Sequence, residues 1–268
     1  MPVKTPQDVI ETAVDNGLKK SILPTPRLIT MSIMGGAYIA LGGALSLIAG
    51  YGFPDSPAAL QKIISGCVFP IGLILIVILG GELFTGNNAM LIPAYMQRRY
   101  SFGAVIRNWS IVYLGNFIGA MVFAWMMVYL CGLTDGEPYR SAIIRVAETK
   151  VSLPWSVIFF RGIGANWCVC LAVWLAMSGR RLSEKMLGCW LPVMAFVVLG
   201  YEHCIANMFF IPLGMMQGAD VSIQSFLIDN LVPATIGNIV GGALFVGIPH
   251  AALYSTPNHD EHNGRSLY

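Results

Sequence analysis

An acid, an imidazole and an amide occur within eight residues in the second half of the chain, in a stretch that is otherwise apolar. The stretch reads Gly200-Tyr201-Glu202-His203-Cys204-Ile205-Ala206-Asn207. No charged residue lies between Met186 and Tyr201, or between His203 and Ala219, so the cluster would lie near mid-depth if this stretch crosses a bilayer. Ionisable groups at that depth are costly and mark functional sites. The glycine and small residues predict a backbone that leaves the helix, which a membrane tolerates only where that backbone faces protein or a cavity.

Composition indicates that the cluster belongs to a polytopic membrane protein. Only 11% of the 268 residues are charged, whereas soluble domains carry about 25%. Several uncharged runs approach or exceed the roughly 20 residues that a spanning helix needs. The predicted spans are 28–51, 63–79, 104–132, 155–178, 186–199 and 226–254, with a shorter apolar segment after the second and the fifth. We therefore expect an all-α protein with six transmembrane helices.

Basic residues predict the orientation of these spans, since they favour the cytoplasmic side. Those that fall on one side are Lys4, Lys19, Lys20, Arg27, Arg98, Arg99, Arg107, Arg180, Arg181, Lys185 and Arg265. Both termini are therefore predicted to be cytoplasmic, and six crossings satisfy that condition.

The chain divides into three predicted parts. Residues 1–27 are expected to form an amphipathic cytoplasmic helix that starts at the capping motif Thr5-Pro6-Gln7-Asp8 and lies on the membrane surface. A plug or gate for a pore is the alternative for this helix. Residues 28–254 are expected to form a transmembrane channel domain, and residues 255–268 a disordered cytoplasmic tail.

An internal repeat is the most specific signal. Gly80-Gly81-Glu82-Leu83-Phe84-Thr85-Gly86-Asn87 aligns with 200–207, and Gly115-Asn116-Phe117-Ile118-Gly119 aligns with Gly237-Asn238-Ile239-Val240-Gly241. The copies, 28–132 and 155–254, each hold three spans, so the second is expected to lie inverted, with the second and fifth helices broken. The half-helices after the breaks would present free N–H groups that favour an anion. The glycines predict close helix packing, with Asn116 and Asn238 bonding the broken segments.

Three motifs, in this order along the chain, resemble the signatures of the formate/nitrite transporter family. They are Gly81 to Asn87, Asn166-Trp167-Cys168-Val169-Cys170-Leu171-Ala172-Val173-Trp174, and Gly200 to Met208. The resemblance covers nearly the whole chain. It implies an aquaporin-like fold in the inner membrane of a prokaryote, a homopentamer with one pore per protomer, and transport of small monovalent anions, usually coupled to protons.

The resemblance also implies roles for individual residues. His203 matches the central pore histidine, and Thr85 matches the threonine of the broken second span that contacts it. Lys150 matches a vestibule lysine, and Asn166 the asparagine that links this lysine towards the histidine. The positions that match the outer hydrophobic constriction are Phe69, Leu73 and Phe196. The positions that match the inner constriction are Leu83, Phe84, Val169 and Asn207.

The two acids of the repeat receive a structural role. Glu202, like Asn207, matches a position that holds the loop and the inner pore mouth, and Glu82 occupies the equivalent place in the first copy. Both carboxylates are expected to accept loop N–H bonds. Arg161 resembles the basic residue of the nitrite and formate-dehydrogenase-associated branches of the family, which leaves the substrate open.

The expected mechanism follows from the cost of moving charge through an apolar constriction. An unpaired anion there is heavily penalised, whereas a neutral weak acid is not. Lys150 and the half-helix ends would attract the anion, which would take a proton near His203, because an imidazole exchanges protons near neutral pH. Formate is the first substrate expected. Nitrite is the alternative, followed by hydrosulfide and short monocarboxylates.

Two other classes of function are disfavoured. Glu202, His203 and Cys204 could serve as acid, base and nucleophile of a membrane enzyme, but adjacent residues on one backbone rarely converge on one substrate atom. A membrane scaffold or receptor is the third reading, and no segment outside the membrane is larger than a loop. We expect no catalytic residue, metal or cofactor, and no nucleic-acid partner. The expected partners are a small anion, membrane lipid and further copies of the chain.

Overall fold

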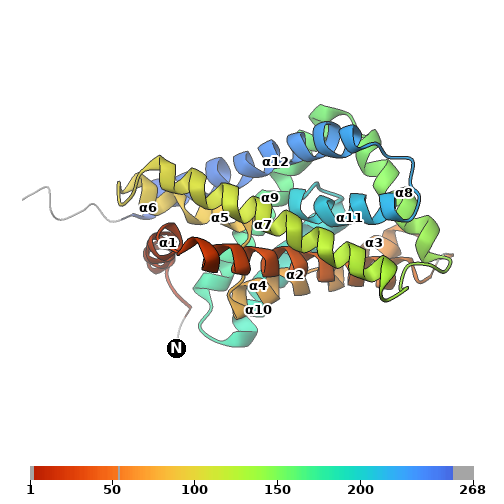
Figure 1. Cartoon of the computed structure of the whole chain (residues 1–268). Coiled ribbons are helices and arrows are strands. Elements are labelled where there is room, and N and C mark those ends of the chain that lie inside the picture. The colour runs from red at the N-terminus through yellow and green to blue at the C-terminus, as the bar shows by residue number, and fades with distance from the viewer. Residues whose placement is uncertain (1–2, 54, 256–268) are drawn as a thin grey trace, which may run out of the picture.

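The computed structural model describes residues 3–53 and 55–255, and the described chain is built from helices (Figure 1). Six helices are long and apolar enough to cross a membrane. They are α2 (Thr25–Tyr51), α3 with α4 (Ala58–Val68 and Ile71–Leu79), α7 (Phe102–Tyr129), α9 (Trp155–Ser178), α10 (Leu182–Leu199), and the last span formed by η1 (Ser225–Leu231), α12 (Val232–Ile239), η2 (Val240–Gly247) and α13 (Ile248–Tyr254). The six predicted spans are confirmed, with ends shifted by a few residues. The tail predicted over residues 255–268 lies, apart from Ser255, outside the described residues.

Shorter helices complete the fold. They are α1 (Pro6–Ser21), α5 (Phe84–Met90), α6 (Ile92–Met96), α8 (Tyr139–Ser152) and α11 (Cys204–Met216). The sequence reading did not anticipate α8, whose composition is mixed rather than apolar. It packs on α11 at one end of the molecule, whereas α1 and α6 lie together at the other end (Figure 1).

The second and fifth spans are broken at the predicted positions. Helix α4 ends at Leu79 and α10 ends at Leu199, and each is followed by a glycine in the left-handed region, Gly80 with φ 84° and Gly200 with φ 70°. Glycine adopts this conformation without steric cost, and it ends a helix sharply. Helices α5 and α11 then continue from the breaks towards opposite ends of the molecule (Figure 1), as an inverted repeat requires.

Glycines bring helix backbones into contact in both halves. A Cβ on Gly119 of α7 would meet the carbonyl of Ile33 on α2, and a Cβ on Gly241 would meet the carbonyl of Ile163 on α9. Only glycine permits such an approach, which is common between membrane helices. The packing role predicted for these glycines is confirmed.

Helix α1 lies against the protein rather than on a membrane surface, so that expectation was wrong. Its apolar stripe of Val9, Ile10, Ala13 and Val14 is at most 7% exposed. The helix packs on α6 and α9, and the backbone N–H of Lys4, two residues before the helix, donates to the carbonyl of Ser178 at the end of α9. The stripe consists of small and medium side chains, which fit between helices as well as they fit into lipid.

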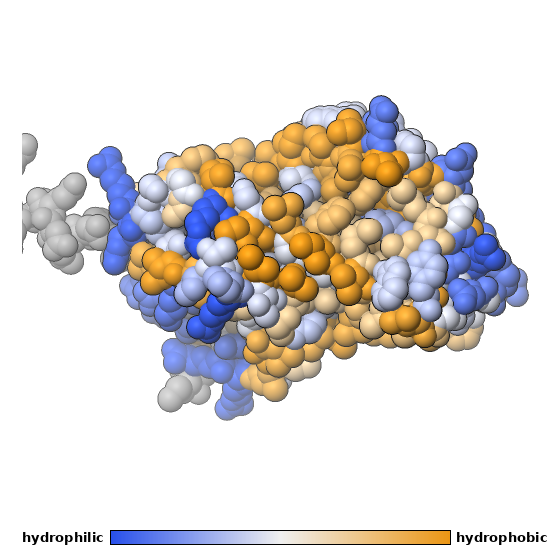
Figure 2. Space-filling view, viewed as in Figure 1, coloured by the Kyte–Doolittle hydropathy of each residue, from blue (hydrophilic) through white to orange (hydrophobic). Residues whose placement is uncertain are grey.

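The face of the bundle seen in Figure 2 is largely apolar along its middle and hydrophilic at both ends. On α7, for example, Leu114, Ile118 and Val122 follow helical spacing and are 47–62% exposed. Such a band suits lipid or another membrane helix.

Candidate functional site

Asn238 holds the break of the fifth span in place. Its Oδ1 accepts the N–H of Cys204 at 2.9 Å, and its Nδ2 donates to the carbonyls of Glu202 at 2.9 Å and Gly162 at 2.8 Å. The Cys204 N–H and the Glu202 carbonyl have no helical partner where the span is interrupted, and a buried unpaired group is costly, whereas the bond to Gly162 ties the break to α9. The predicted role of Asn238 is therefore confirmed.

Asn116 does the same for the break of the second span. Its Oδ1 accepts the N–H of Phe84 at 2.9 Å, and its Nδ2 donates to the carbonyls of Glu82 at 2.8 Å and Ser32 at 2.7 Å. The two copies of the repeat thus use one asparagine each, in the same way, to keep irregular backbone satisfied inside the membrane.

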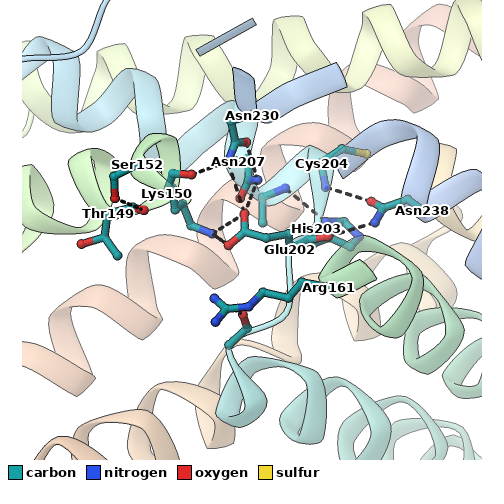
Figure 3. Close-up of polar contacts among 12 residues, drawn as sticks. Thr149, Lys150, Ser152, Arg161, Glu202, His203, Cys204, Asn207, Asn230 and Asn238 are labelled. Atoms are coloured by element: carbon teal, nitrogen blue, oxygen red, sulfur yellow. Dashed lines mark hydrogen bonds and ion pairs between the residues drawn. The ribbon is translucent and has the colours of Figure 1, made fainter. Parts of the chain in front are cut away.

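Glu202 belongs to a buried polar cluster at the break of the fifth span (Figure 3). Its carboxylate oxygens lie 3.0 and 3.1 Å from Lys150 Nζ, and one of them accepts Asn207 Nδ2 at 2.7 Å. Asn207 also donates to Asn230 Oδ1 at 2.7 Å, and Asn230 donates to the carbonyl of Lys150 at 2.8 Å. The carboxylate is held by a lysine and an amide, so the expectation that it accepts loop N–H groups was wrong.

Glu82 lies in an equivalent cluster at the other break. It pairs with Lys20 Nζ at 2.5 Å and accepts Asn87 Nδ2 at 2.7 Å. Asn87 in turn donates to Asn108 Oδ1 at 2.9 Å, and Asn108 donates to the carbonyl of Lys20 at 3.3 Å. The lysine comes from α1, which is thereby tied to the broken span.

Sequence reasoning missed three members of these clusters. Asn108 and Asn230 are separated along the chain by the same interval as Asn116 and Asn238, and this signal could have identified them. Lys20 has no such signal, because α1 lies outside the repeat.

The ring of His203 lies between the two broken spans. Its Nε2 is 3.0 Å from the hydroxyl of Thr85, and its Nδ1 accepts the backbone N–H of Ala206 at 3.1 Å, which caps α11. An N–H can only donate, so Nδ1 carries no proton and the neutral ring bears its proton on Nε2. That proton faces Thr85. His203 is 2% exposed and Thr85 is fully buried, so little of the pair is accessible from outside the protein.

A cavity of about 450 Å³ opens on the α8 side of this ring. Its lining includes Lys150, Glu202 and His203, together with Phe69 and Phe196 of the predicted outer constriction. The rings of Phe69 and Phe196 meet edge to face with centroids 5.7 Å apart, and Phe196 stacks on His203 at 5.7 Å. The Phe69–Phe196 contact, here termed the throat, is therefore apolar and adjoins the histidine on the lining of a cavity that mixes apolar and charged side chains.

Other site residues lie differently from the sequence expectation. Asn207 and Glu202 line the same cavity as Phe69 and Phe196, so they group with the residues expected at the outer constriction rather than with the other residues expected at the inner one. The repeat makes the two breaks alike in sequence and cannot tell which side of the ring each faces. Leu73 is buried but is not among the residues lining this cavity.

The residues expected at the inner constriction, apart from Asn207, are buried at the start of α5 and on α9. Leu83, Phe84 and Val169 are 2–3% exposed. The ring of Phe84 packs sideways on Tyr113, with centroids 4.9 Å apart.

Asn166 also differs from its expected role. It donates to the carbonyls of Thr85 at 3.1 Å and Asn238 at 2.6 Å and to Asn88 Oδ1 at 3.1 Å. Among the described contacts of Asn166 none reaches Lys150 or His203. It joins the backbone of α5 to that of α12 in the last span instead of linking the lysine to the histidine.

The side chains of Glu202, His203 and Cys204 point to different partners. The carboxylate meets Lys150, the ring meets Thr85, and the thiol lies on the side of Thr235 on α12. They do not converge on one point, which removes the geometric basis for an acid, base and nucleophile acting together.

Comparison with known families agrees with this geometry. The model of the formate/nitrite transporter family matches residues 7–252. The chain belongs to this family. A probable formate transporter of Methanothermobacter thermautotrophicus is 39% identical over 94% of this chain and 96% of its own length. The formate channel FocA of Escherichia coli K12 is 33% identical over 96% of both chains.

Solved structures of formate/nitrite transporters share the fold. A channel described as an FNT family ion channel superposes with a TM-score of 0.84 at 30% identity, covering 93% of this chain and 99% of its own. A pentameric formate channel with formate bound gives a TM-score of 0.75 at 31% identity, covering 86% and 97%. The protein is thus a multi-pass membrane protein of a family of transporters and channels.

Proposed function

We propose that the protein moves small monovalent weak acids, formate first, through a pore within each protomer, as the neutral acid. The observation that carries this proposal is the Thr85–His203 pair, 3.0 Å apart and buried directly beside the Phe69–Phe196 contact. It supplies polar partners where a solute would pass from the cavity into the apolar throat.

The throat favours a neutral solute over an ion. Desolvating a bare carboxylate beside two phenylalanine rings costs several kcal/mol, because no counter-charge accompanies it. A neutral acid loses only its hydrogen bonds with water, and these can be replaced. The Nε2–H of His203 can donate to its carbonyl oxygen, and the Thr85 hydroxyl oxygen can accept its O–H.

This mechanism changes the role expected for the histidine. An imidazolium would carry a second proton on Nδ1, where the Ala206 N–H already points at 3.1 Å. A charged ring would therefore have to give up the cap of α11. We assign proton uptake by the anion to the water-filled cavity, and we assign to the neutral ring the role of hydrogen-bond donor in the throat.

The substrate and assembly are inferred from relatives and from the size of the site. Relatives named as formate transporters or channels span nearly the whole chain. The related pentameric channel with formate bound supports a homopentamer. We place both termini in the cytoplasm of a prokaryote, with α1 on the inner side of the inner membrane. Nitrite, a planar anion of similar size, is the second candidate substrate.

Uptake of labelled formate by proteoliposomes tests this function. With a more acidic exterior, formate should accumulate inside far above the level in empty liposomes, and unlabelled nitrite should compete while a large dicarboxylate should not. Wild-type proteoliposomes that accumulate no more formate than empty ones would refute the proposal.

The ion pair in the cavity gives a prediction of its own. Lys150→Ala leaves the Glu202 carboxylate without its counter-ion, so the cavity should repel the anion it now attracts. We expect the half-saturating formate concentration to rise roughly tenfold, which corresponds to about 1.4 kcal/mol. The double variant Lys150→Ala with Glu202→Gln removes both charges and should recover most of the loss. Equal half-saturation in the wild type and Lys150→Ala would contradict this account.

A further inference from the structure

The cavity beside His203 carries more positive charge than its ion pair uses. Four cationic side chains line it, but Glu202 is the one carboxylate among the described lining residues. The cations are Lys62, Arg145, Lys150 and Arg161. Lys150 is bound by both oxygens of Glu202, at 3.0 and 3.1 Å, so its charge is largely compensated. Attraction of an anion into the cavity therefore depends on the other three.

Arg161 is the one of these three that lies at the break itself. Lys62 and Arg145 are exposed, whereas Arg161 is half-buried. Its carbonyl accepts the N–H of Glu202 at 3.3 Å, and its Nη1 lies 3.5 Å from the carbonyl of Gly200. Both contacts are with the short break that also carries His203. Figure 3 shows the guanidinium extending alongside the Lys150–Glu202 pair.

The guanidinium of Arg161 has N–H donors beyond the one that contacts Gly200. Its contact with Gly200 is long, and no carboxylate among the residues that the structure describes pairs with it. An arginine presents five N–H donors in a planar fork, which matches the two oxygens of a carboxylate or similar anion. A lysine in its place would act as a point charge and attract any small anion.

We infer that Arg161 determines specificity, by binding planar two-oxygen anions through its guanidinium fork before they reach His203. Formate and nitrite can accept both N–H groups at once, whereas hydrosulfide has a single sulfur and cannot. Lys62 and Arg145 add attraction without regard to shape. This inference rests on the proposed function, because it assumes that the cavity admits the transported anion.

The conservative variant Arg161→Lys tests the fork separately from the charge. In proteoliposomes, the half-saturating concentrations of formate and of nitrite should each rise about tenfold, with maximal flux retained, because a paired contact becomes a single one. The hydrosulfide concentration that half-inhibits formate uptake should stay within about twofold of the wild-type value. The preference for formate over hydrosulfide therefore falls. Arg161→Gln should raise the half-saturating formate concentration at least as much.

The matched control is Lys62→Gln, which removes an exposed cation from the same cavity. It should weaken the binding of formate and of hydrosulfide by the same factor and leave the ratio of their half-saturating and half-inhibiting concentrations unchanged. The inference would be overturned if Arg161→Lys kept the half-saturating formate concentration of the wild type. It would also be overturned if the half-saturating formate concentration and the half-inhibiting hydrosulfide concentration rose by the same factor. Failure of the wild-type protein to move formate would instead refute the proposed function.

Discussion

Replacing His203 with phenylalanine is expected to lower formate flux in proteoliposomes by roughly 100-fold or more. The change removes the donor facing Thr85 and puts a third apolar ring beside Phe69 and Phe196. A neutral acid would then cross the throat without polar partners, at a cost of about 3 kcal/mol. Initial rates of labelled formate uptake under an inward proton gradient measure the effect.

Glutamine at the same position separates hydrogen bonding from proton exchange. Its amide can donate towards Thr85 but cannot titrate, so His203→Gln should retain a substantial part of the flux and its dependence on external pH. If the flux of His203→Gln is as low as that of His203→Phe, the imidazole itself must take up a proton. Unchanged pH-dependent flux in His203→Phe would contradict any role for the ring.

The largest effect on stability is expected from Asn238→Leu. The substitution leaves the Cys204 N–H and the Glu202 carbonyl at the break without their Asn238 partner in a buried site, and it also removes the bond to the Gly162 carbonyl of α9. Each unpaired buried group costs about 1–3 kcal/mol, so the loss should be about 3 kcal/mol or more. Thermal unfolding in detergent should show a midpoint lowered by roughly 10 °C, and transport should be lost.

Two further variants make this result specific. Asn116→Leu removes the equivalent three bonds at the other break and should destabilise the protein by a similar amount. Asn16→Leu changes the same residue type on α1, where its amide contacts Met177 Sδ at 3.7 Å, and should have little effect. An unfolding midpoint for Asn238→Leu equal to that of Asn16→Leu would refute the role of the asparagine.

The breaks could be predicted because local sequence determines them. Glu82 and Glu202 each interrupt an apolar run after a glycine, and the two copies of the repeat confirm one another along the chain. A charge that must avoid lipid and a residue that favours positive φ identify such a site before any tertiary contact is known. The contacts of Asn116 and Asn238 followed from the same reasoning.

The charge partners could not be predicted in this way. Lys20 lies on α1 and Lys150 on α8, helices outside the repeated spans, and their spacing does not follow the repeat. Only the tertiary fold brings them to Glu82 and Glu202. The cavity that Asn207 lines could not be predicted for a related reason, because repeat symmetry fixes which residues are equivalent but not which cavity each one faces.

Helix α1 shows the limit of an amphipathic pattern. The stripe containing Ile10 and Ala13 predicted a helix with one apolar face, which the structure confirms. The pattern does not distinguish lipid from protein as the partner of that face. Tertiary contacts with α6 and α9, and the Lys20–Glu82 pair, decide in favour of protein.

Formate flux under a clamped membrane potential tests the central claim most directly. A neutral acid carries no charge across the membrane, so the accumulation of formate in proteoliposomes should follow the pH gradient and should not change between 0 and about 100 mV. Passage of the bare anion would instead couple accumulation to the potential, which contributes about 2.3 kcal/mol per charge at about 100 mV, or roughly 50-fold. Potential-independent accumulation, with one proton entering per formate, is the predicted result. Accumulation that follows the potential at constant pH would contradict the account.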